Sequence, residues 1–282
     1  MERRCPDFVI PGFARCGTTW LYEVLKRHPS IFLPERKELD FFSESYAKGY
    51  PFYAAYFAAA RPDQLTGDLS PVYAEHPEVP ERLAATRPDA RIIIVVRNQV
   101  DRLRSSYWQS RRDGWSHAEL DRFLAGEVED CGYLLNQRYA PTVEAYRRLF
   151  GAEAVLVLVY EDMSRDPETA IRAILRHLGL GQELPEPMAE LLGERVNPTF
   201  MPKYPLIYRS AQRINQALRK AHLPFLDRPL AYGKAVFFRL FGARQRQELG
   251  RIPGEDRLKR YFAGDIAALE RLLGRSLAGV WY

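Results

Sequence analysis

Residues 12–19 read GFARCGTT and combine two glycines, a cation and two hydroxyl groups in the register of a phosphate-binding loop. The loop of nucleoside triphosphatases is G-x-x-x-x-G-K-[ST]. Here both glycines and Thr19 match, whereas Thr18 occupies the lysine position and the cation is Arg15. Between a strand and a helix, such a loop presents backbone N–H groups to an anion. The sequence therefore predicts phosphate binding of a kind that differs from the triphosphate–magnesium type.

A second anion-binding pattern follows the most apolar segment of the chain. Residues 91–96 read RIIIVV, and five consecutive β-branched residues predict a strand buried on both faces of a parallel sheet. Arg97 follows directly, and Ser105 lies eight residues further on. An arginine at this point binds phosphate through two parallel hydrogen bonds and repels a metal ion. Glu161 or Asp162, after another buried strand, is the alternative metal carboxylate, but we predict no metal site.

Apolar periodicity and turn residues predict one α/β domain with a central, mainly parallel sheet flanked by helices. The domain is expected to span 1–282, with a core at about 6–182 and an irregular, helical cap at about 183–282 that forms the acceptor site. The segment 31–44 is expected to be extended, and 185–235 irregular with short helices. Strands are expected at 7–12, within 64–75, at 91–96 and at 154–160, and helices at 18–29, 49–60, 80–90, 100–112, 140–151, 166–180 and 256–274.

Composition excludes some classes of partner. The 282 residues carry a net charge of +5, and basic residues alternate with acidic ones rather than forming the blocks typical of nucleic-acid binding. Cys5, Cys16 and Cys131 lack metal-ligand spacing and predict free thiols, although Cys5 and Cys16 could pair. There is no leader-like start and no run of about 18 apolar residues. We expect a soluble, cytoplasmic protein without nucleic-acid or membrane partners.

Three motifs in order resemble those of the sulfotransferases that use 3′-phosphoadenosine-5′-phosphosulfate (PAPS). They read RCGTTWLYEVLKRHP for the 5′-phosphosulfate loop, RKELDFF for the element typical of the heparan sulfate branch, and IIIVVRNQVDRLRSSY for the 3′-phosphate element. The resemblance continues through TGDLSPVY, VYEDMSRDP and DIAALERLLGRSLAGVW, and so covers nearly the whole chain. It implies the P-loop-containing nucleotide hydrolase-like fold of these enzymes.

The resemblance also implies roles for individual residues. Arg15 and the loop amides would hold the 5′-phosphate and the charge developing on the bridging oxygen. Arg97 and Ser105 would clamp the 3′-phosphate, and Glu38 lies where this branch carries its general base. The residues implied for binding PAPS and its product PAP are Arg15, Cys16, Gly17, Thr18, Thr19, Trp20, Arg97, Ser105, Tyr139 and Lys203, with Glu38 and Arg15 as the catalytic pair.

The chain departs from the heparan sulfate branch at two positions. Leu69 stands where that branch carries a lysine, and Asp40 stands where histidine is common. Both changes remove cations that would meet an anionic sugar polymer. We therefore predict sulfuryl transfer to a hydroxyl or phenol of a small-molecule acceptor, giving a sulfate ester and PAP.

Two other functions are weighed against this prediction. A P-loop kinase-like phosphotransferase would need a lysine after Gly17 and a metal-binding aspartate, and a non-catalytic nucleotide-binding protein would not need Glu38. Ser106 is a rival for the role of Ser105, whereas His28 and His117 suit structural roles better than that of a base. Assembly into a homo-oligomer is left open.

Overall fold

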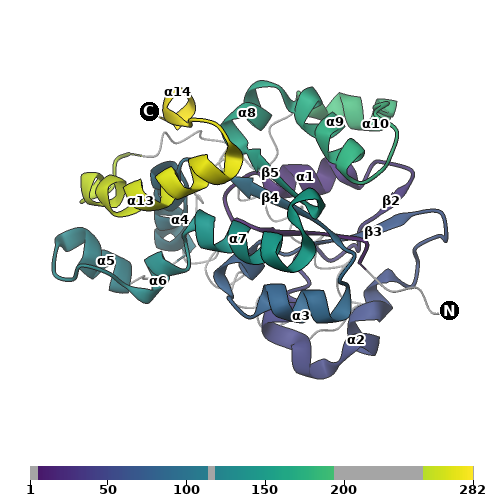
Figure 1. Cartoon of the computed structure of the whole chain (residues 1–282), viewed down its shortest axis with the longest axis horizontal. Coiled ribbons are helices and arrows are strands. Elements are labelled where there is room, and N and C mark those ends of the chain that lie inside the picture. The colour runs from purple at the N-terminus through teal and green to yellow at the C-terminus, as the bar shows by residue number, and fades with distance from the viewer. Residues whose placement is uncertain (1–5, 114–117, 194–249, 282) are drawn as a thin grey trace.

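A parallel sheet of five strands lies at the centre of the computed structural model, which describes residues 6–113, 118–193 and 250–281 (Figure 1). The strand order is β2-β3-β1-β4-β5, and every adjacent pair is parallel. This confirms the predicted α/β class and the four predicted strands. The strands are β1 (Phe8–Gly12), β2 (Ile31–Phe32), β3 (Leu65–Leu69), β4 (Arg91–Val96) and β5 (Val155–Val159).

Helices cover both faces of this sheet, with α1, α9 and α10 on one side and α3 and α7 on the other (Figure 1). The central strands β1 and β4 are apolar because neither of their faces meets solvent. Residues 92–96 of β4 are fully buried. The helices are α1 (Thr18–Leu25), α2 (Tyr50–Ala54), α3 (Val79–Thr86), α4 (Gln99–Asp113), α5 (Ala118–Ala125), α6 (Gly132–Leu135), α7 (Tyr139–Phe150), α8 (Tyr160–Arg165), α9 (Pro167–His177), α10 (Glu186–Leu192), α13 (Glu255–Leu273) and α14 (Ala278–Trp281).

The segment 31–44 is not extended throughout, as the sequence suggested. Its strand ends at Phe32, and Phe41–Ser45 forms a π-helical turn. The physical reason is the aromatic pair: the turn buries both Phe41 and Phe42, whose rings pack against Tyr53 with centroids 4.4 and 5.2 Å away. An alternating strand would have pointed two consecutive phenylalanines to opposite faces.

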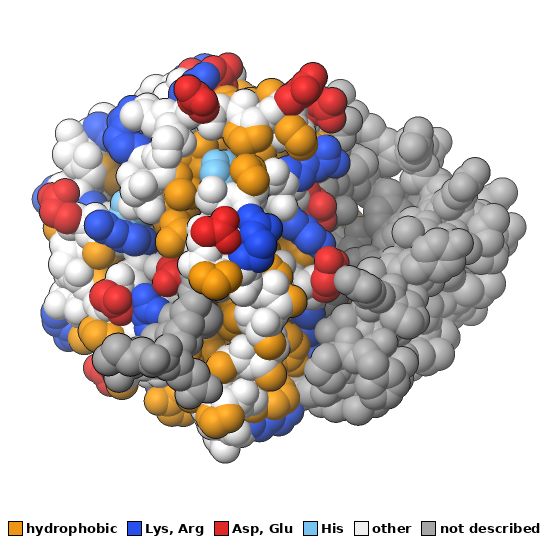
Figure 2. Space-filling view, turned by 90° about the vertical axis from the view of Figure 1, so that its right-hand side faces the viewer, with side chains coloured by type: hydrophobic (Ala, Val, Ile, Leu, Met, Phe, Trp, Pro, Cys, Tyr) orange, Lys and Arg blue, Asp and Glu red, His pale blue; other side chains and the backbone are white. Residues whose placement is uncertain are grey.

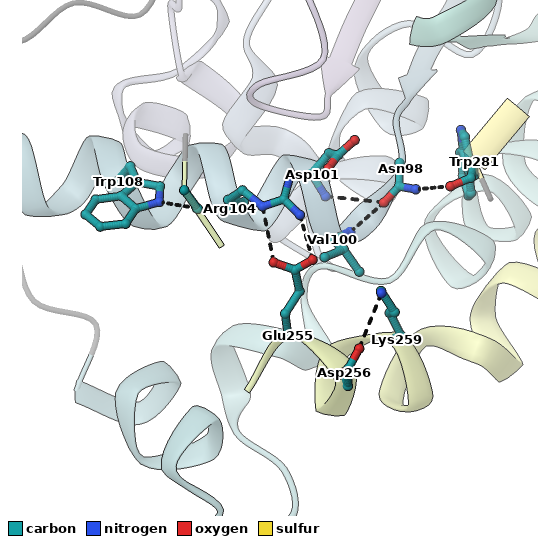
Figure 3. Close-up of polar contacts among 10 residues, drawn as sticks. Asn98, Val100, Asp101, Arg104, Trp108, Glu255, Asp256, Lys259 and Trp281 are labelled. Atoms are coloured by element: carbon teal, nitrogen blue, oxygen red, sulfur yellow. Dashed lines mark hydrogen bonds and ion pairs between the residues drawn. The ribbon is translucent and has the colours of Figure 1, made fainter. Parts of the chain in front are cut away.

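The last described helices dock onto α4, as Figure 3 shows. Arg104 of α4 pairs with the buried carboxylate of Glu255 in α13 at 2.6 Å. Asn98, just before α4, donates its amide N–H to the carbonyl of Trp281 at 2.7 Å. Asp265 of α13 accepts the backbone N–H of Tyr139 at 2.8 Å and so caps the start of α7. These contacts fix α4, which begins two residues after Arg97.

Charges of both signs are interspersed on the surface. On the face drawn in Figure 2, Lys and Arg side chains lie beside Asp and Glu side chains, with apolar side chains between them. No single-sign patch covers the described part of that face, as the sequence predicted. Within the described ranges, every helix is too short or too polar to cross a bilayer.

Candidate active site

The loop between β1 and α1 has the geometry of an anion-binding helix start. Gly17 precedes α1 with φ 83°, and a Cβ there would lie 2.9 Å from Met163 and 3.1 Å from Tyr160. Only glycine suits a left-handed conformation with so little space. The first helical hydrogen bond runs from Leu21 N to Gly17 O at 3.0 Å, so the amides of Thr18 and its two successors have no acceptor within the helix.

Two arginines and a serine from distant parts of the sequence meet at this loop. Arg15 donates through Nε to the hydroxyl of Ser105 at 2.8 Å. Arg97 donates to the carbonyl of Arg15 at 3.0 Å, and its guanidinium lies 4.7 Å from the ring centre of Tyr160. The structure therefore brings together Arg15, Arg97 and Ser105. Ser105 lies in α4, more than one helical turn after its first residue, and contacts Arg15.

Other predicted binding residues lie beside or beneath the loop. Tyr139 is fully buried and its hydroxyl donates to the carbonyl of Arg97 at 2.8 Å, so in this structure it positions Arg97. Cys16 is fully buried, and burial raises the pKa of its thiol to about 11, so its backbone is the part that can face a ligand. Trp20 donates its indole N–H to Leu191 O at 3.3 Å. Lys203 lies outside the described residues.

The predicted base sits on a segment that reaches back over the loop. Lys37 donates to Glu38 Oε1 at 2.6 Å and to Thr19 Oγ1 at 3.0 Å. This ammonium joins the predicted base to the phosphate loop. The sequence analysis included Lys37 in the motif RKELDFF but gave it no role of its own; the signal available was its place directly before the predicted base.

Backbone conformation singles out the same residues. Among the described residues, three that are not glycine have positive φ: Arg15 at 67°, Glu38 at 64° and Asp40 at 51°. Such conformations are uncommon away from glycine and gather at functional sites, where surrounding structure holds them. Here Glu38 N donates to Leu69 O at 3.2 Å, and Asp40 N donates to Ser70 Oγ at 3.1 Å.

A buried carboxyl group supports this segment from β3. Asp68 accepts hydrogen bonds from Ser70 at 2.7 Å, Tyr53 at 2.8 Å and Tyr73 at 2.9 Å, and burial raises its pKa. Because Ser70 donates to Asp68, its oxygen is oriented to accept from Asp40 N. The motif DLSP therefore anchors the backbone that carries Glu38.

Asp40 adds a second carboxyl group beside Glu38. Burial raises its pKa to about 7, with further contributions from the negative charges of Glu38, Asp68 and Glu44. Its Oδ1 atom is buried and accepts no hydrogen bond from the described residues. The position therefore presents acid, not a cation, next to the candidate base.

The carboxylates considered for a metal have structural partners. Glu161 accepts from Asn98 N at 3.0 Å and from the indole N–H of Trp281 at 2.8 Å, and Asp162 pairs with Arg275. In the described part of the chain, His, Cys, Asp and Glu form no group of three or more that could hold a metal. His28 is buried, and its Nδ1 accepts from Ser30 N at 3.1 Å, a contact that suits the structural role expected for it.

Comparisons with known proteins identify the family of the chain. A family model described as "Sulfotransferase domain" matches residues 5–195, which is more than half of the chain. The chain therefore belongs to the sulfotransferase family. A solved structure of a sulfotransferase from Alicyclobacillus acidocaldarius matches with a TM-score of 0.64 and 24% identity, covering 98% of each chain, which shows a shared fold.

Curated relatives match over shorter stretches. Human heparan sulfate glucosamine 3-O-sulfotransferase 6 is 30% identical over 184 residues, which cover 64% of this chain and 54% of that protein. Membrane-associated sulfotransferase kil1 of Dictyostelium discoideum is 33% identical over 138 residues, covering 45% of this chain and 29% of that protein. The chain thus spans about half or less of the length of these relatives.

The raised pKa of Asp40 predicts a pH-dependent stability. A carboxyl group whose pKa is about 7 when folded and 3.8 ordinarily favours the folded state at low pH and loses that contribution as pH rises from about 4 to 7. Asp40→Asn removes the free-energy cost of ionising a buried carboxyl group. We expect it to stabilise the protein by about 1–3 kcal/mol at pH 8, allowing for partial solvent screening, and hardly at all at pH 4.

Urea unfolding of both proteins across this pH range measures the difference. Asp63→Asn is the matched control, because that aspartate is 70% exposed and pairs with Arg61. If Asp40→Asn raised the free energy of unfolding equally at pH 4 and pH 8, the account would be contradicted.

Proposed function

We propose that this protein transfers the sulfuryl group of PAPS to a hydroxyl or phenol of a small-molecule acceptor, releasing PAP and a sulfate ester. The observation that carries the proposal is the contact of one ammonium, Lys37, with both Glu38 and Thr19. This contact supports a role of Glu38 as general base for a group that would bind at the loop. Membership of the sulfotransferase family supports the same reaction.

The loop fits the charged part of PAPS. The amides of Gly17, Thr18 and Thr19 and the start of α1 would bind the 5′-phosphate, with Arg15 adding a guanidinium. Arg97, fixed by Tyr139 and Tyr160, would bind the 3′-phosphate together with Ser105. These donors are held in place before any ligand arrives, which is what electrostatic stabilisation of a transferring group requires.

Glu38 would act on the acceptor. A hydroxyl has a pKa far above 7, so a carboxylate that accepts its proton late in the displacement is an effective base. The acceptor oxygen forms a bond to sulfur while the bond from sulfur to the 5′-phosphate oxygen breaks. The proton passes to Glu38, and the electron pair of the broken bond stays on PAP, beside Arg15.

A small acceptor suits the residues around Glu38 better than an anionic polymer. At two positions where the resemblance to the heparan sulfate branch implies cations, this chain has Leu69 and Asp40. Asp40 also lies close to the negative charges of Glu38 and Asp68. Phe41, Phe42 and Tyr53 belong to the buried core, whereas the partly buried Tyr50, Phe52 and Tyr56 of the same segment would offer apolar surface to an acceptor. The region 183–282 would complete the acceptor site, in a protein that we expect to act in the cytoplasm.

A kinase-like reaction is the rival proposal. It lacks support because Thr18 stands in the lysine position and Glu161 and Asp162 are engaged in structural contacts. We therefore expect turnover of PAPS to persist in EDTA and to need no added magnesium.

The first prediction concerns the 3′-phosphate. Arg97→Ala should weaken PAP binding by about 30-fold or more, because a charged two-point contact is lost, and should change AMP binding far less. Titration calorimetry with both nucleotides measures this difference. Arg91→Ala, at the opposite end of β4, is the matched control and should leave both affinities unchanged. Equal losses for PAP and AMP would remove Arg97 from the 3′-phosphate site.

The second prediction concerns the base. Glu38→Gln keeps the shape of the side chain but cannot take a proton, so kcat should fall by roughly 10²–10⁴ while PAP affinity stays nearly constant. Glu35→Gln is the control, since Glu35 lies on the same segment, is exposed and pairs with Lys26 at 2.7 Å. Near-normal turnover by Glu38→Gln in a PAP-release assay would place the base elsewhere.

A further inference from the structure

A fully buried arginine lies behind the loop between β1 and α1. Arg102 of α4 is 1% exposed, and its guanidinium lies 5.0 Å from the ring centre of Phe13 and 5.1 Å from that of Tyr139. Phe13 belongs to the loop, and Tyr139 donates its hydroxyl hydrogen to Arg97 O at 2.8 Å. The guanidinium therefore packs, within the core, against one residue of the loop and against the residue that positions Arg97.

This guanidinium is held by neutral groups. Its Nη1 donates to Gln137 Oε1 at 2.6 Å, and its Nη2 donates to Gln137 O at 3.0 Å. Within the described ranges, Arg102 forms no ion pair with a carboxylate, and Arg102 Nε and Gln137 Nε2 have no hydrogen-bond partner. Both of these unpartnered atoms are donors. A charge in a protein core normally has a partner of opposite sign, because its transfer from water costs free energy.

The other ionisable groups near Arg102 do not supply that partner. Asp265 accepts three N–H groups, one from Gln99 and two from the start of α7. The charge of Glu75 acts on Arg102, but the two side chains form no ion pair. Burial raises the pKa of the Cys16 thiol to about 11, so that this group is neutral at pH 7. One positive charge therefore stands behind the loop without a counter-ion from the described residues.

We propose that Arg102 is a positioning residue of the nucleotide site, and that the anion bound at the loop is the counter-ion of its buried charge. This proposal rests on the proposed function. Arg102 acts through Phe13 and Tyr139, which it holds in place, and through its electric field, without touching the ligand. The field is weakly screened because the guanidinium is buried away from water.

This role differs from the contact proposed for Arg97. Loss of a direct contact with the 3′-phosphate affects PAP and leaves AMP binding nearly unchanged. The field of Arg102 acts on every charge of the ligand. At pH 8 each phosphate monoester carries about two negative charges, so PAP carries about four and AMP about two. Neutralising Arg102 should therefore weaken the binding of both nucleotides, and that of PAP more strongly.

Gln137→Glu tests the role by supplying the missing counter-ion. It keeps the oxygen that Arg102 contacts and replaces the unpartnered Nε2 by a second oxygen, so it removes no hydrogen bond between described residues. Gln182→Glu is the matched control, because Gln182 Oε1 also accepts from an arginine, Arg176 Nη2 at 2.8 Å, but both of these side chains are exposed. Titration calorimetry at pH 8 measures PAP and AMP affinity, and urea unfolding without nucleotide measures stability.

We expect Gln137→Glu to weaken PAP binding by about 10- to 30-fold and AMP binding by about 3- to 5-fold, because the new carboxylate neutralises Arg102 inside the core. Its free energy of unfolding without nucleotide should equal or exceed that of the wild type, since a buried cation gains a partner. Gln182→Glu should change neither affinity nor stability. A merely structural disturbance would lower stability and affinity together.

A comparison of Arg102→Lys with Arg102→Met separates charge from packing. Lysine keeps the charge but lacks the planar group, so Arg102→Lys should bind PAP at least about fivefold more tightly than Arg102→Met. If either variant fails to fold, the Gln137→Glu result alone decides.

Three results would overturn the role of Arg102. They are a PAP affinity of Gln137→Glu within twofold of wild type, a Gln137→Glu protein that is less stable than wild type, and equal PAP affinities of Arg102→Lys and Arg102→Met. A wild-type protein that neither binds PAP nor releases it from PAPS would instead overturn the proposed function itself.

Discussion

The site depends on one constraint, the pairing of β1 between β3 and β4 in parallel. Because all three strands run in the same direction, their carboxyl ends meet at one edge of the sheet. The phosphate loop follows β1, the Ser70 anchor follows β3 and Arg97 follows β4. A change in the order of the strands would separate these groups even if every side chain were kept. The buried, apolar residues of β4 stabilise this arrangement, since the central position of the strand keeps both of its faces away from water.

Backbone strain is concentrated where the chemistry is proposed. Arg15, Glu38 and Asp40 adopt left-handed conformations, each of which costs on the order of 1–3 kcal/mol. Hydrogen bonds from Arg97 to Arg15 O, from Glu38 N to Leu69 O and from Asp40 N to Ser70 offset this cost. The surrounding fold therefore holds both halves of the site ready before a ligand binds. Such preorganisation favours charge stabilisation, because donors need not be reoriented during the reaction.

The sequence predicted what depends on local pattern. The strands 91–96 and 7–12 and the loop between β1 and α1 follow from apolar runs and glycines. It did not predict contacts set by tertiary packing. The interaction of Lys37 with Thr19 joins segments that are 18 residues apart, and the π-helical turn at Phe41–Ser45 follows from ring packing. Tyr139 was expected near the nucleotide, and its burial beneath Arg97 depends on its cap from Asp265, more than 100 residues away.

A crystal structure of the protein with bound PAP tests the central claim most directly, namely that the loop and the Glu38 segment form one site for a 3′,5′-bisphosphorylated nucleotide. The account predicts the 5′-phosphate within hydrogen-bond distance of the amides of Thr18 and Thr19, with Lys37 Nζ beside it, and the 3′-phosphate against Arg97. A 5′-phosphate bound away from α1, or a 3′-phosphate that Arg97 does not contact, would contradict it.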